Sequence, residues 1–528
     1  MNNNKRVSYF CMEYGLDSDF KIYSGGLGIL AGDILKAAKD LEKPLVAVGI
    51  LWRQGYNRQI IEQDRITDCF PEYNYDFLKD TGVAVDVVIR GRKVKLKVWL
   101  CDCFGNVPLY LLDANLPENA DRLITGQLYG WFGEERIAQE MILGIGGVRA
   151  LRALGIETDI YHFNDSHPIF AGFELIKCKM ADGMTFAQAK KAVRNSIVFT
   201  THTPVEAGNE VHSHELLRYM GAYDGLTKRQ AVSIGGDPFN MTVAGLRLSK
   251  TANGVAQLHG ETANNMWSYV SEAAPIIAVT NGVHNGTWQD EAIAAACHDG
   301  DIMAGHMVLK RRMLDEIARR NGVKLDENVL TIGFARRAAP YKRAQLIFSK
   351  PEIIEGLLAE KKLQIVFAGK AHPNDLAGKA LVGKMYEMSR KYKDSIVFLQ
   401  DYDMKIGAML TRGCDVWLNN PVRPMEACGT SGMKAAMNGV LNFSTLDGWW
   451  PEGCEHGING WQIGGGYVGE NQDEHDADSL YETLINEVMP TYYNDKSKWT
   501  DMMRASVKMS TYRFSAARMV EDYYDLMY

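Results

Sequence analysis

The apolar runs between positions 330 and 420 decide the predicted fold: LTIGFARR (330–337), LQIVFAGKA (363–371), DSIVFLQD (394–401) and CDVWLNN (414–420). Each run is short and rich in β-branched or aromatic residues, which is typical of a strand buried on both faces. Helical segments lie at 376–392 and 404–412, where apolar residues recur every three or four positions. Strands that alternate with helices predict βαβ units in a doubly wound α/β fold.

Runs of the same kind lie in the first half of the chain: RVSYFCMEYG (6–15), PLVAVGILW (44–52), TDIYHFND (158–165), SIVFTTHT (196–203) and PIIAVTNG (275–282). They predict a second set of buried parallel strands, and the domain boundary is expected in segment 281–301, between the two sets. Segment 85–112 differs, because its apolar residues alternate with period two around Gly91 and Gly105. This alternation predicts a small antiparallel insertion.

Composition bounds the class of protein. A length of 528 residues exceeds what one core usually organises, and 46% hydrophobic with 10% aromatic residues excludes a disordered chain. The 58 Lys and Arg against 65 Asp and Glu give a net charge of −7, which argues against nucleic acid as a partner. The sequence has no signal-like or membrane-spanning apolar run, so we expect a cytoplasmic protein without a membrane partner.

Cysteine spacing gives no sign of a metal centre. The nine cysteines are scattered, and the closest pair, Cys101 and Cys103, has no second pair to complete a zinc tetrad. The sequence therefore predicts reduced thiols, most of them in the core, and no metal ligands.

The first candidate site is the glycine-rich segment SGGLGILAG (24–32). It follows an early strand and opens a helix, so its backbone N–H groups suit an anion at the helix N-terminus. A tight strand-to-helix turn without a ligand explains the same glycines equally well. The spacing of Gly26, Gly28 and Gly32 is not a dinucleotide-binding fingerprint.

The second candidate site is a cluster of cations after the strand LTIGFA: Arg336, Arg337, Lys342 and Arg343. The cluster begins at the carboxyl end of a predicted buried strand, where doubly wound folds bind ligands, and guanidinium groups suit phosphate oxygens. A solvated helix face is the alternative. No Walker A motif accompanies the cations, which argues against an NTPase.

The third candidate site is EACGTSGMKAAMNG (426–439), which follows a strand and leads into a helix. Gly429, Thr430 and Ser431 suit a helix N-terminus that receives a phosphate, and Lys434 follows within the first turn. Ser431 and Lys434 match S-x-x-K of penicillin-recognising enzymes, but the chain contains neither S-D-N nor K-T-G. Two alternatives remain: a lysine that forms a Schiff base with pyridoxal phosphate, and an exposed helical lysine.

The segment RPMEACGTSGMKAAMNGVLNFSTLDGWWPEG (423–453) strongly resembles the α-glucan phosphorylases, the glycogen, starch and maltodextrin phosphorylase family, and especially their compact bacterial and archaeal branch. Further motifs resemble the landmarks of this family in the same order: SGGLGILAGD, HFNDSHP, TTHTPVEAGNE, NGVAQLHGE, VTNGVHNGTW and RRAAPYKR. The resemblance runs from about Val7 to Gly466.

The resemblance implies a GT-B type fold of two facing Rossmann-like domains with the active site in the cleft between them. It places an N-terminal glucan- and phosphate-cleft domain at 1–292 and a domain that binds pyridoxal 5'-phosphate at 293–505. A C-terminal helix at 506–528 is expected to cross back to the first domain.

Residue roles follow from the resemblance, motif by motif. It makes Lys434 the lysine that holds pyridoxal phosphate, with Arg336, Thr430 and Ser431 near the cofactor phosphate. Arg337, Lys342 and the Gly25–Gly26 turn are expected to hold inorganic phosphate. The residues expected to contact the glucan or line the cleft are His202, Asn281, Glu426, Gly429, Asp165, His167 and Tyr341. Lys434, Arg337, Lys342 and His202 are the expected catalytic residues.

The implied activity is the reversible phosphorolysis of an α-1,4-glucan or maltodextrin to glucose 1-phosphate, in which the cofactor phosphate exchanges a proton with the substrate phosphate. The alternatives are a nucleotide-sugar-dependent glucan synthase, a glycoside hydrolase and a catalytically silent glucan-binding protein. A homodimer is compatible with this family. Allosteric and phosphoserine control are not expected, because this chain lacks the segments that carry them in animal enzymes.

Some positions depart from the family pattern. Cys428 stands where many relatives have Ser, Ser431-Gly432 replaces Gly-Asn, and Pro340 replaces an acidic residue. These departures leave the substrate preference open. Trp449 and Trp450 suit either a sugar subsite or the core.

Overall fold

The structure is a computed structural model that describes residues 4–130, 132–205 and 208–528. Glu206 and Ala207 of the motif TTHTPVEAGNE lie outside the described residues. The described chain divides into two compact units. Unit 1 comprises the described residues of Met1–Tyr56, Phe70–Thr280 and Met519–Tyr528, and unit 2 comprises Asn57–Cys69 and Asn281–Arg518.

Unit 1 is built on a sheet whose strands lie in the order β13-β12-β9-β8-β1-β2-β7-β6-β5. The strands from β13 to β7 pair in parallel, whereas β5, β6 and β7 pair antiparallel at one edge. The period-two segment thus extends the main sheet. The strand bounds are β1 (Val7–Phe10), β2 (Leu45–Ile50), β5 (Lys79–Ile89), β6 (Arg92–Cys101), β7 (Leu109–Asp113), β8 (Ile160–Asn164), β9 (Ile197–Thr200), β12 (Thr251–Gly254) and β13 (Ile276–Ala278).

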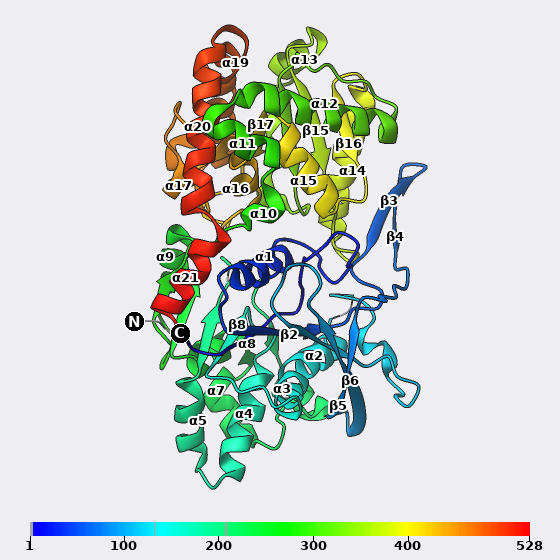
Figure 1. Ribbon diagram of the computed structural model, residues 1–528, viewed down its shortest axis with the longest axis vertical. Helices are drawn as coiled ribbons and strands as arrows, with labels where there is room; N and C mark the ends of the chain where they lie inside the picture. The colour runs from blue at the N-terminus through cyan, green and yellow to red at the C-terminus, as the bar shows by residue number, and fades with distance from the viewer. Residues whose placement is uncertain (1–3, 131, 206–207) are drawn as a thin grey trace. The chain divides into compact units, whose positions relative to one another are not determined.

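In the parallel part of the unit 1 sheet, the strand order runs outward from β1 in both directions, with β2 on one side of it and β8 on the other. Figure 1 shows α1 on one face of this sheet and α2, α3 and α4 on the other. A switch point of this kind is where doubly wound sheets bind ligands. The helices of unit 1 are α1 (Gly26–Asp40), α2 (Glu134–Met141), α3 (Gly147–Ala153), α4 (Phe170–Ala181), α5 (Phe186–Arg194), α6 (His214–Met220), α7 (Lys228–Gly235), α8 (Met241–Leu248), α9 (Gln257–Met266) and, from Met519 onward, α21 (Ala516–Leu526).

The core of unit 1 contains a neutral histidine. His162 in β8 is fully buried, and its ring nitrogens lie 2.6 Å from the Tyr528 hydroxyl and 2.7 Å from the Thr200 hydroxyl. Burial lowers the pKa of His162 to about 3. The last residues of the described chain therefore complete the hydrogen bonding of a strand near the middle of the sheet.

This burial predicts a pH dependence of stability. Below about pH 6.5 the unfolded chain protonates His162 while the folded chain does not, so the free energy of unfolding falls as the pH falls. One such group contributes about 1.4 kcal/mol per pH unit between about pH 6 and pH 4. In His162→Gln this contribution is absent, so urea titrations across that range give a shallower slope than for the unsubstituted chain. His475→Gln, at an exposed site, is the control, and parallel slopes for His162→Gln and the unsubstituted chain would contradict the assignment.

Unit 2 is built on a parallel sheet with the order β16-β15-β14-β17-β18-β19. Numbered along the chain, these strands lie as 3-2-1-4-5-6, which is the strand order of Rossmann folds. The α/β fold class with parallel sheets, predicted from the sequence, is confirmed. The strand bounds are β14 (Thr331–Ala335), β15 (Gln364–Ala368), β16 (Ile396–Leu399), β17 (Val416–Asn419), β18 (Leu441–Thr445) and β19 (Gly460–Ile463).

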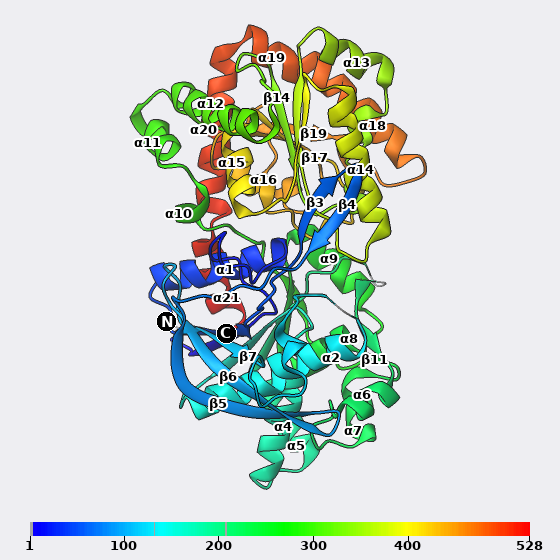
Figure 2. The ribbon, with the colours of Figure 1, turned by 90° about the vertical axis from the view of Figure 1, so that its right-hand side faces the viewer.

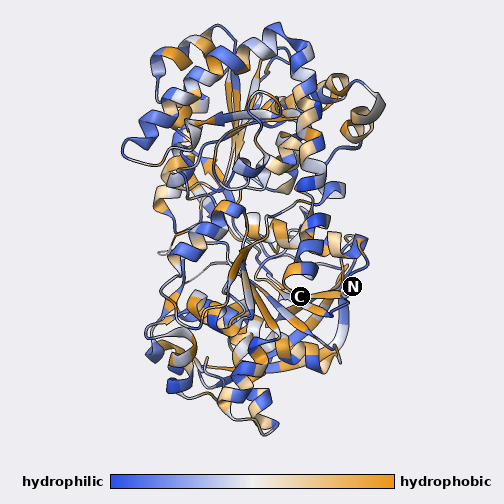
Figure 3. Ribbon diagram, turned by 90° about the vertical axis from the view of Figure 1, so that its left-hand side faces the viewer, coloured by the Kyte–Doolittle hydropathy of each residue, from blue (hydrophilic) through white to orange (hydrophobic). Residues whose placement is uncertain are grey.

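Both faces of the unit 2 sheet are buried, which explains the continuous apolar runs of its strands. Ile365 and Phe367 of β15 pack in one core cluster, whereas Val366 and Ala368 pack in another. Figure 2 shows the sheet between α12, α15 and α16 on one side and α14 and α18 on the other. In Figure 3 the strands are mostly hydrophobic, while the outer faces of the helices are largely hydrophilic.

The helices of unit 2 complete its layers, and a hairpin from early in the chain joins them. The helices are α10 (Asn285–Trp288), α11 (Glu291–Asp299), α12 (Ile302–Asn321), α13 (Pro351–Ala359), α14 (Leu376–Lys391), α15 (Met404–Gly413), α16 (Ser431–Ala436), α17 (Trp450–Gly453), α18 (Gln472–Thr483), α19 (Met489–Asn494) and α20 (Lys496–Arg513). The hairpin consists of β3 (Arg58–Glu62) and β4 (Arg65–Cys69). Across the described ranges, we find no helix with both the length and the apolar character that a bilayer span requires.

Candidate functional site

The cationic cluster begins where β14 ends, at the switch point between β14 and β17. The Arg336 guanidinium lies 4.7 Å from the Phe334 ring, and its Nη2 donates to the Leu418 carbonyl at 3.4 Å. Its Nε is buried and has no hydrogen-bond partner among the described residues. Burial lowers the pKa of Arg336, while the nearby Glu426 carboxylate opposes this shift. Arg336 is therefore a desolvated cation whose Nε–H group can still donate a hydrogen bond.

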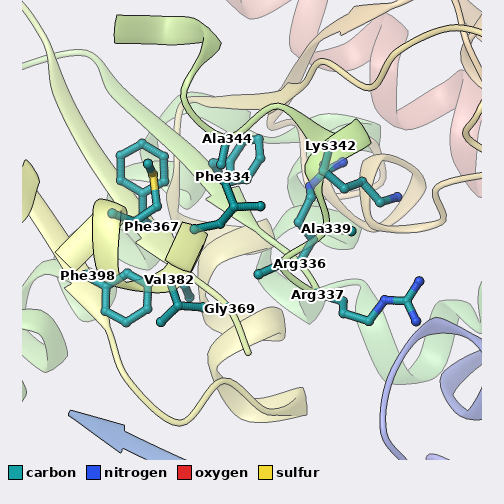
Figure 4. A pocket seen from close by; sticks show the side chains of 14 residues that line it. Phe334, Arg336, Arg337, Ala339, Lys342, Ala344, Phe367, Gly369, Val382 and Phe398 are labelled. Carbon is teal, nitrogen blue, oxygen red and sulfur yellow. The ribbon is translucent and has the colours of Figure 1, made fainter. Parts of the chain in front are cut away.

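A small pocket lies beside these cations at the carboxyl ends of β14 and β15. Its volume is about 20 Å³, which is room for a water molecule but not for a sugar. Most of its lining is apolar. Figure 4 shows this lining, which includes Arg336, Arg337, Lys342, Phe334, Phe367, Val382 and Phe398.

Glu426 brings two of the cations together. Lys342 Nζ forms an ion pair with Glu426 Oε2, and Arg336 Nη1 lies 3.7 Å from the same oxygen. Burial by itself would raise the pKa of Glu426, but Lys342 and Arg336 outweigh burial and hold this pKa below its usual value. The result is an ionised buried carboxylate beside two cations. The cations can donate hydrogen bonds to an anion, and the carboxylate can accept one from a hydroxyl group.

Arg343 has a structural role. Its guanidinium donates to oxygens of Asn420, Pro421, Asp473 and Asp476 at 2.7 to 2.9 Å. The preceding turn is also fixed, because the Val422 N–H donates to the Tyr341 carbonyl at 2.8 Å. Arg343 therefore positions Tyr341 and Lys342, and its charge is already matched by carboxylates.

Lys434 lies in α16, which begins at Ser431 after Gly429 and Thr430. Gly429 has a φ of +83°, and a Cβ there would lie 3.3 Å from Glu426 Cγ, so both conformation and space favour glycine. Lys434 is 8% exposed, and its ammonium lies 3.6 Å from the centre of the Trp288 ring. The alternative of an exposed helical lysine is therefore wrong.

Asn281 and Cys428 are neighbours in unit 2. The side chain of Asn281 is buried, and its Oδ1 accepts no hydrogen bond within the described ranges. The backbone N–H of Asn281 bonds to the Cys428 sulfur, and burial raises the pKa of this thiol well above its usual value. Trp449 N–H donates to the Cys428 carbonyl at 3.0 Å. Cys428 is thus a buried, protonated thiol that contributes mainly its backbone.

We therefore expect Cys428→Ser to retain nearly full activity, with a loss of stability of about 1 kcal/mol for the buried hydroxyl. Thiol-specific reagents should modify the exposed Cys69 and Cys103 while Cys428 stays unmodified. Peptide mass mapping after labelling checks this. Loss of most activity in the variant, or labelling of Cys428 that substrate prevents, would instead indicate a catalytic thiol.

Trp449 and Trp450 belong to the core. They are 1% and 0% exposed, and the Trp449 ring lies 4.7 Å from the ring of Phe514. Of the two alternatives stated from the sequence, the structure confirms burial in the core.

In unit 1 the glycine-rich segment is anchored by Glu13, which follows β1. Its carboxylate accepts hydrogen bonds from the backbone N–H groups of Ser24 and Gly25 at 2.6 and 3.2 Å. A Cβ on Gly28 would lie 2.5 Å from Glu13 Oε2, so this glycine is required for packing. At Gly25 and Gly26, by contrast, a Cβ would meet no described atom within 4 Å. Gly25 and Gly26 thus leave open space at the start of α1.

Glu13 was not among the candidates that the sequence predicts. It is 2% exposed, and it also accepts a hydrogen bond from the Tyr129 hydroxyl at 3.0 Å. A signal was present, because Glu13 is an acidic residue directly after a buried strand.

Asp165, His167 and His202 lie at the carboxyl ends of β8 and β9. Asp165 has a φ of +66°, an uncommon conformation that often marks functional positions, and burial raises its pKa to about 7. Burial lowers the pKa of His167 to about 4 and that of His202 to about 3, so both are neutral at pH 7. His202 Nε2 lies 2.6 Å from Asn164 Oδ1, which fixes its ring.

The predicted residues thus fall in two sets, one in each unit. The set in unit 1 consists of Gly25, Gly26, Asp165, His167 and His202, and the set in unit 2 consists of Asn281, Arg336, Arg337, Tyr341, Lys342, Glu426, Gly429, Thr430, Ser431 and Lys434.

Comparison with known proteins gives the relationship of the chain. Residues 290–452 match the family model of the carbohydrate phosphorylases. Over 99% of its length the chain is 40% identical to a maltodextrin phosphorylase of Thermococcus litoralis, of which it covers 70%. It is 35% identical to a glycogen phosphorylase of Aquifex aeolicus, of which it covers 86%. An uncharacterized protein of Methanocaldococcus jannaschii is 37% identical and is covered completely. The chain belongs to the carbohydrate phosphorylase family.

Proposed function

We propose that this protein is an α-glucan phosphorylase, which transfers the non-reducing-end glucose of an α-1,4-glucan to inorganic phosphate and releases α-D-glucose 1-phosphate. The observation that carries the proposal is the similarity over 99% of the chain to proteins named maltodextrin and glycogen phosphorylase. The family match at 290–452 contains Arg336, Thr430, Ser431 and Lys434.

The residues of unit 2 fit pyridoxal 5'-phosphate. Lys434 offers a buried amine against an aromatic ring, and the buried Nε of Arg336 has no partner in the described part of the chain. Thr430 and Ser431 start α16, where backbone N–H groups favour a phosphate. We propose that Lys434 holds the cofactor and that Arg336, Thr430 and Ser431 bind its phosphate. When bound, the cofactor supplies a phosphate group with a second pKa near 6, which suits proton transfer near neutral pH.

The remaining residues of unit 2 bind the substrates in this proposal. Phosphorolysis requires two phosphates close together, and Arg336, Arg337 and Lys342 supply the positive charge that offsets their repulsion. Glu426 orients Lys342 and accepts hydrogen bonds from sugar hydroxyl groups, with Asn281, Tyr341 and the backbone of Gly429 alongside. Because the substrate phosphate is the nucleophile, no paired carboxylates are needed.

The residues of unit 1 complete the site in this proposal. The Gly25–Gly26 turn holds inorganic phosphate, and the open space beside it admits the anion. His202 binds the terminal glucose, and its backbone carbonyl stabilises positive charge at the reacting carbon. Asp165 and His167 line the glucan path. The GT-B arrangement expected from the sequence belongs to this proposal.

One experiment tests the function. The purified protein is incubated with maltodextrin and phosphate, and the product is identified. Glucose 1-phosphate is the expected product, in a reaction that needs phosphate. Free glucose would indicate a glycoside hydrolase, and turnover of UDP- or ADP-glucose without any reaction of phosphate would indicate a glucan synthase. Purified protein that carries no pyridoxal phosphate would favour a catalytically silent glucan-binding protein.

A further inference from the structure

A cluster of ligand-type side chains in unit 1 takes no part in the proposed reaction. It consists of Glu140 in α2, Glu210 just before β10 (Val211–His212), and His212 in β10, and we call it the Glu140 cluster. His212 Nε2 lies 3.5 Å from Glu140 Oε2 and 3.8 Å from Glu210 Oε2. One donor atom from each residue lies within 4.8 Å of the others. Segments 70 positions apart in the sequence thus bring an imidazole and two carboxylates to one point.

The Glu140 cluster is buried and unsatisfied. The Glu140 side chain is 0% exposed, and neither of its oxygens has a hydrogen-bond partner within the described residues. His212 Nε2 and Glu210 Oε2 are likewise buried without such a partner there. A buried carboxylate without any donor carries a large desolvation cost. The donors that would normally offset this cost are missing from the surrounding described side chains, with one exception.

The exception is Arg136, whose Nη1 donates to Glu210 Oε1 at 2.6 Å. This bond satisfies one oxygen of Glu210 and leaves the other, Oε2, directed toward His212. Hydrogen bonds to the outer oxygen of a carboxylate are how proteins orient metal ligands. Arg136 neutralises one of the two carboxylates, so Glu140 must be balanced either by a proton or by a second cation.

Three ways of balancing Glu140 can be compared by geometry. A protonated His212 would balance the charge only as an ion pair at 3.5 and 3.8 Å, which is longer than the usual N–H···O hydrogen bond. A proton shared between the two carboxylates would leave His212 Nε2 without a partner. A metal ion would serve all three groups, and tetrahedral bonds of about 2.0–2.1 Å place ligand atoms about 3.3 Å apart. The separations of His212 Nε2 from the two carboxylates, 3.5 and 3.8 Å, are close to that value.

We propose that Glu140, Glu210 and His212 bind one divalent transition-metal ion, of which Zn²⁺ best suits one imidazole nitrogen and two carboxylate oxygens. The fourth position is then open to water. The ion ties α2 to β10 and so fixes this part of unit 1. Metal binding is measured without any phosphorolysis assay, so the two proposals fail independently.

Metal titration of the complete protein tests the proposal. Protein dialysed against a chelator is titrated with Zn²⁺ by calorimetry, and with Co²⁺ while the visible absorption is recorded. We expect one equivalent of either metal to bind, with the strong visible bands of four-coordinate Co²⁺. We also expect His212→Gln and Glu140→Gln each to weaken binding at least about 100-fold, because each removes a ligand outright.

The matched control is His456→Gln, which removes an imidazole that lies 2.9 Å from a carboxylate oxygen of Glu487 at a solvent-accessible site. This variant should bind the metal like the unsubstituted protein. Circular dichroism verifies that each variant is folded. An unsubstituted protein that binds neither metal overturns the proposal without any variant. Binding that is unchanged in both folded ligand variants also overturns it.

Discussion

Lys434→Ala is expected to purify without covalently held pyridoxal phosphate and to lose at least about 100- to 10,000-fold in the rate of phosphorolysis, the range that acid–base groups contribute to catalysis. The reason is structural as well as chemical. Lys434 is a buried lysine beside an aromatic ring, at a helix start suited to a phosphate. Borohydride reduction followed by peptide mass mapping should place a pyridoxyl group on the Lys434 peptide of the unsubstituted protein.

Two further variants separate attachment from packing. Lys434→Arg keeps a cation near the Trp288 ring but cannot attach the cofactor, so we expect it to be as inactive as the alanine variant. Lys405→Ala, at an exposed position in α15, should retain both cofactor and activity. An unmodified Lys434 peptide from fully active protein would overturn the assignment.

Arg337→Ala should weaken the use of phosphate far more than the binding of glucan. Arg337 is exposed at the end of β14, where its guanidinium is accessible to an anion. Loss of a charge-assisted hydrogen bond of about 1.5–3 kcal/mol corresponds to roughly 10- to 150-fold in apparent phosphate affinity or turnover. Steady-state kinetics with phosphate varied at saturating maltodextrin measures this, and the variant should keep its pyridoxal phosphate.

Lys342→Ala should lower phosphate use to a similar degree, and it should also raise the KM for maltodextrin. Its ion pair with Glu426 is lost, which leaves this buried carboxylate with Arg336 at 3.7 Å as the nearest cation of the cluster. If Arg337 and Lys342 share one anion, the double variant loses less than the product of the single losses. Normal phosphate kinetics combined with weak maltodextrin binding in Arg337→Ala would show that the phosphate site lies elsewhere.

Strands with continuous apolar runs could be predicted from the sequence, because burial on both faces leaves a strong local signal. β14, β15, β16 and β17 are of this kind. β18 and β19 escaped prediction because polar residues interrupt their apolar runs. Asn442 in β18 is buried, and its amide donates to the Gly432 carbonyl at 2.9 Å. This tertiary hydrogen bond satisfies the buried amide of Asn442, and the sequence does not reveal it.

The candidate site could also be predicted only in part from the sequence. Motifs indicated Lys434 and the cations after β14, but charge alone did not separate Arg343 from its neighbours. Its role depends on Asp473 and Asp476, which lie more than a hundred positions away in the sequence. The sequence around Glu140 and around His212 has no pattern typical of a metal site, so only the folded chain shows that the two residues lie together.

Neither unit is made from one continuous stretch of chain, and this has a consequence for synthesis on the ribosome. Residues 519–528 are translated only after all of 281–518, so Tyr528 reaches His162 when unit 2 has already emerged. The hairpin at 57–69 is likewise translated well before its partners in unit 2, because the Gln59 side chain donates a hydrogen bond to the carbonyl of Ala371. Each unit therefore finishes folding only after translation has passed through the other. A gene cut between codons 280 and 281 would encode two fragments, each lacking a strand pair or a helix that its core requires.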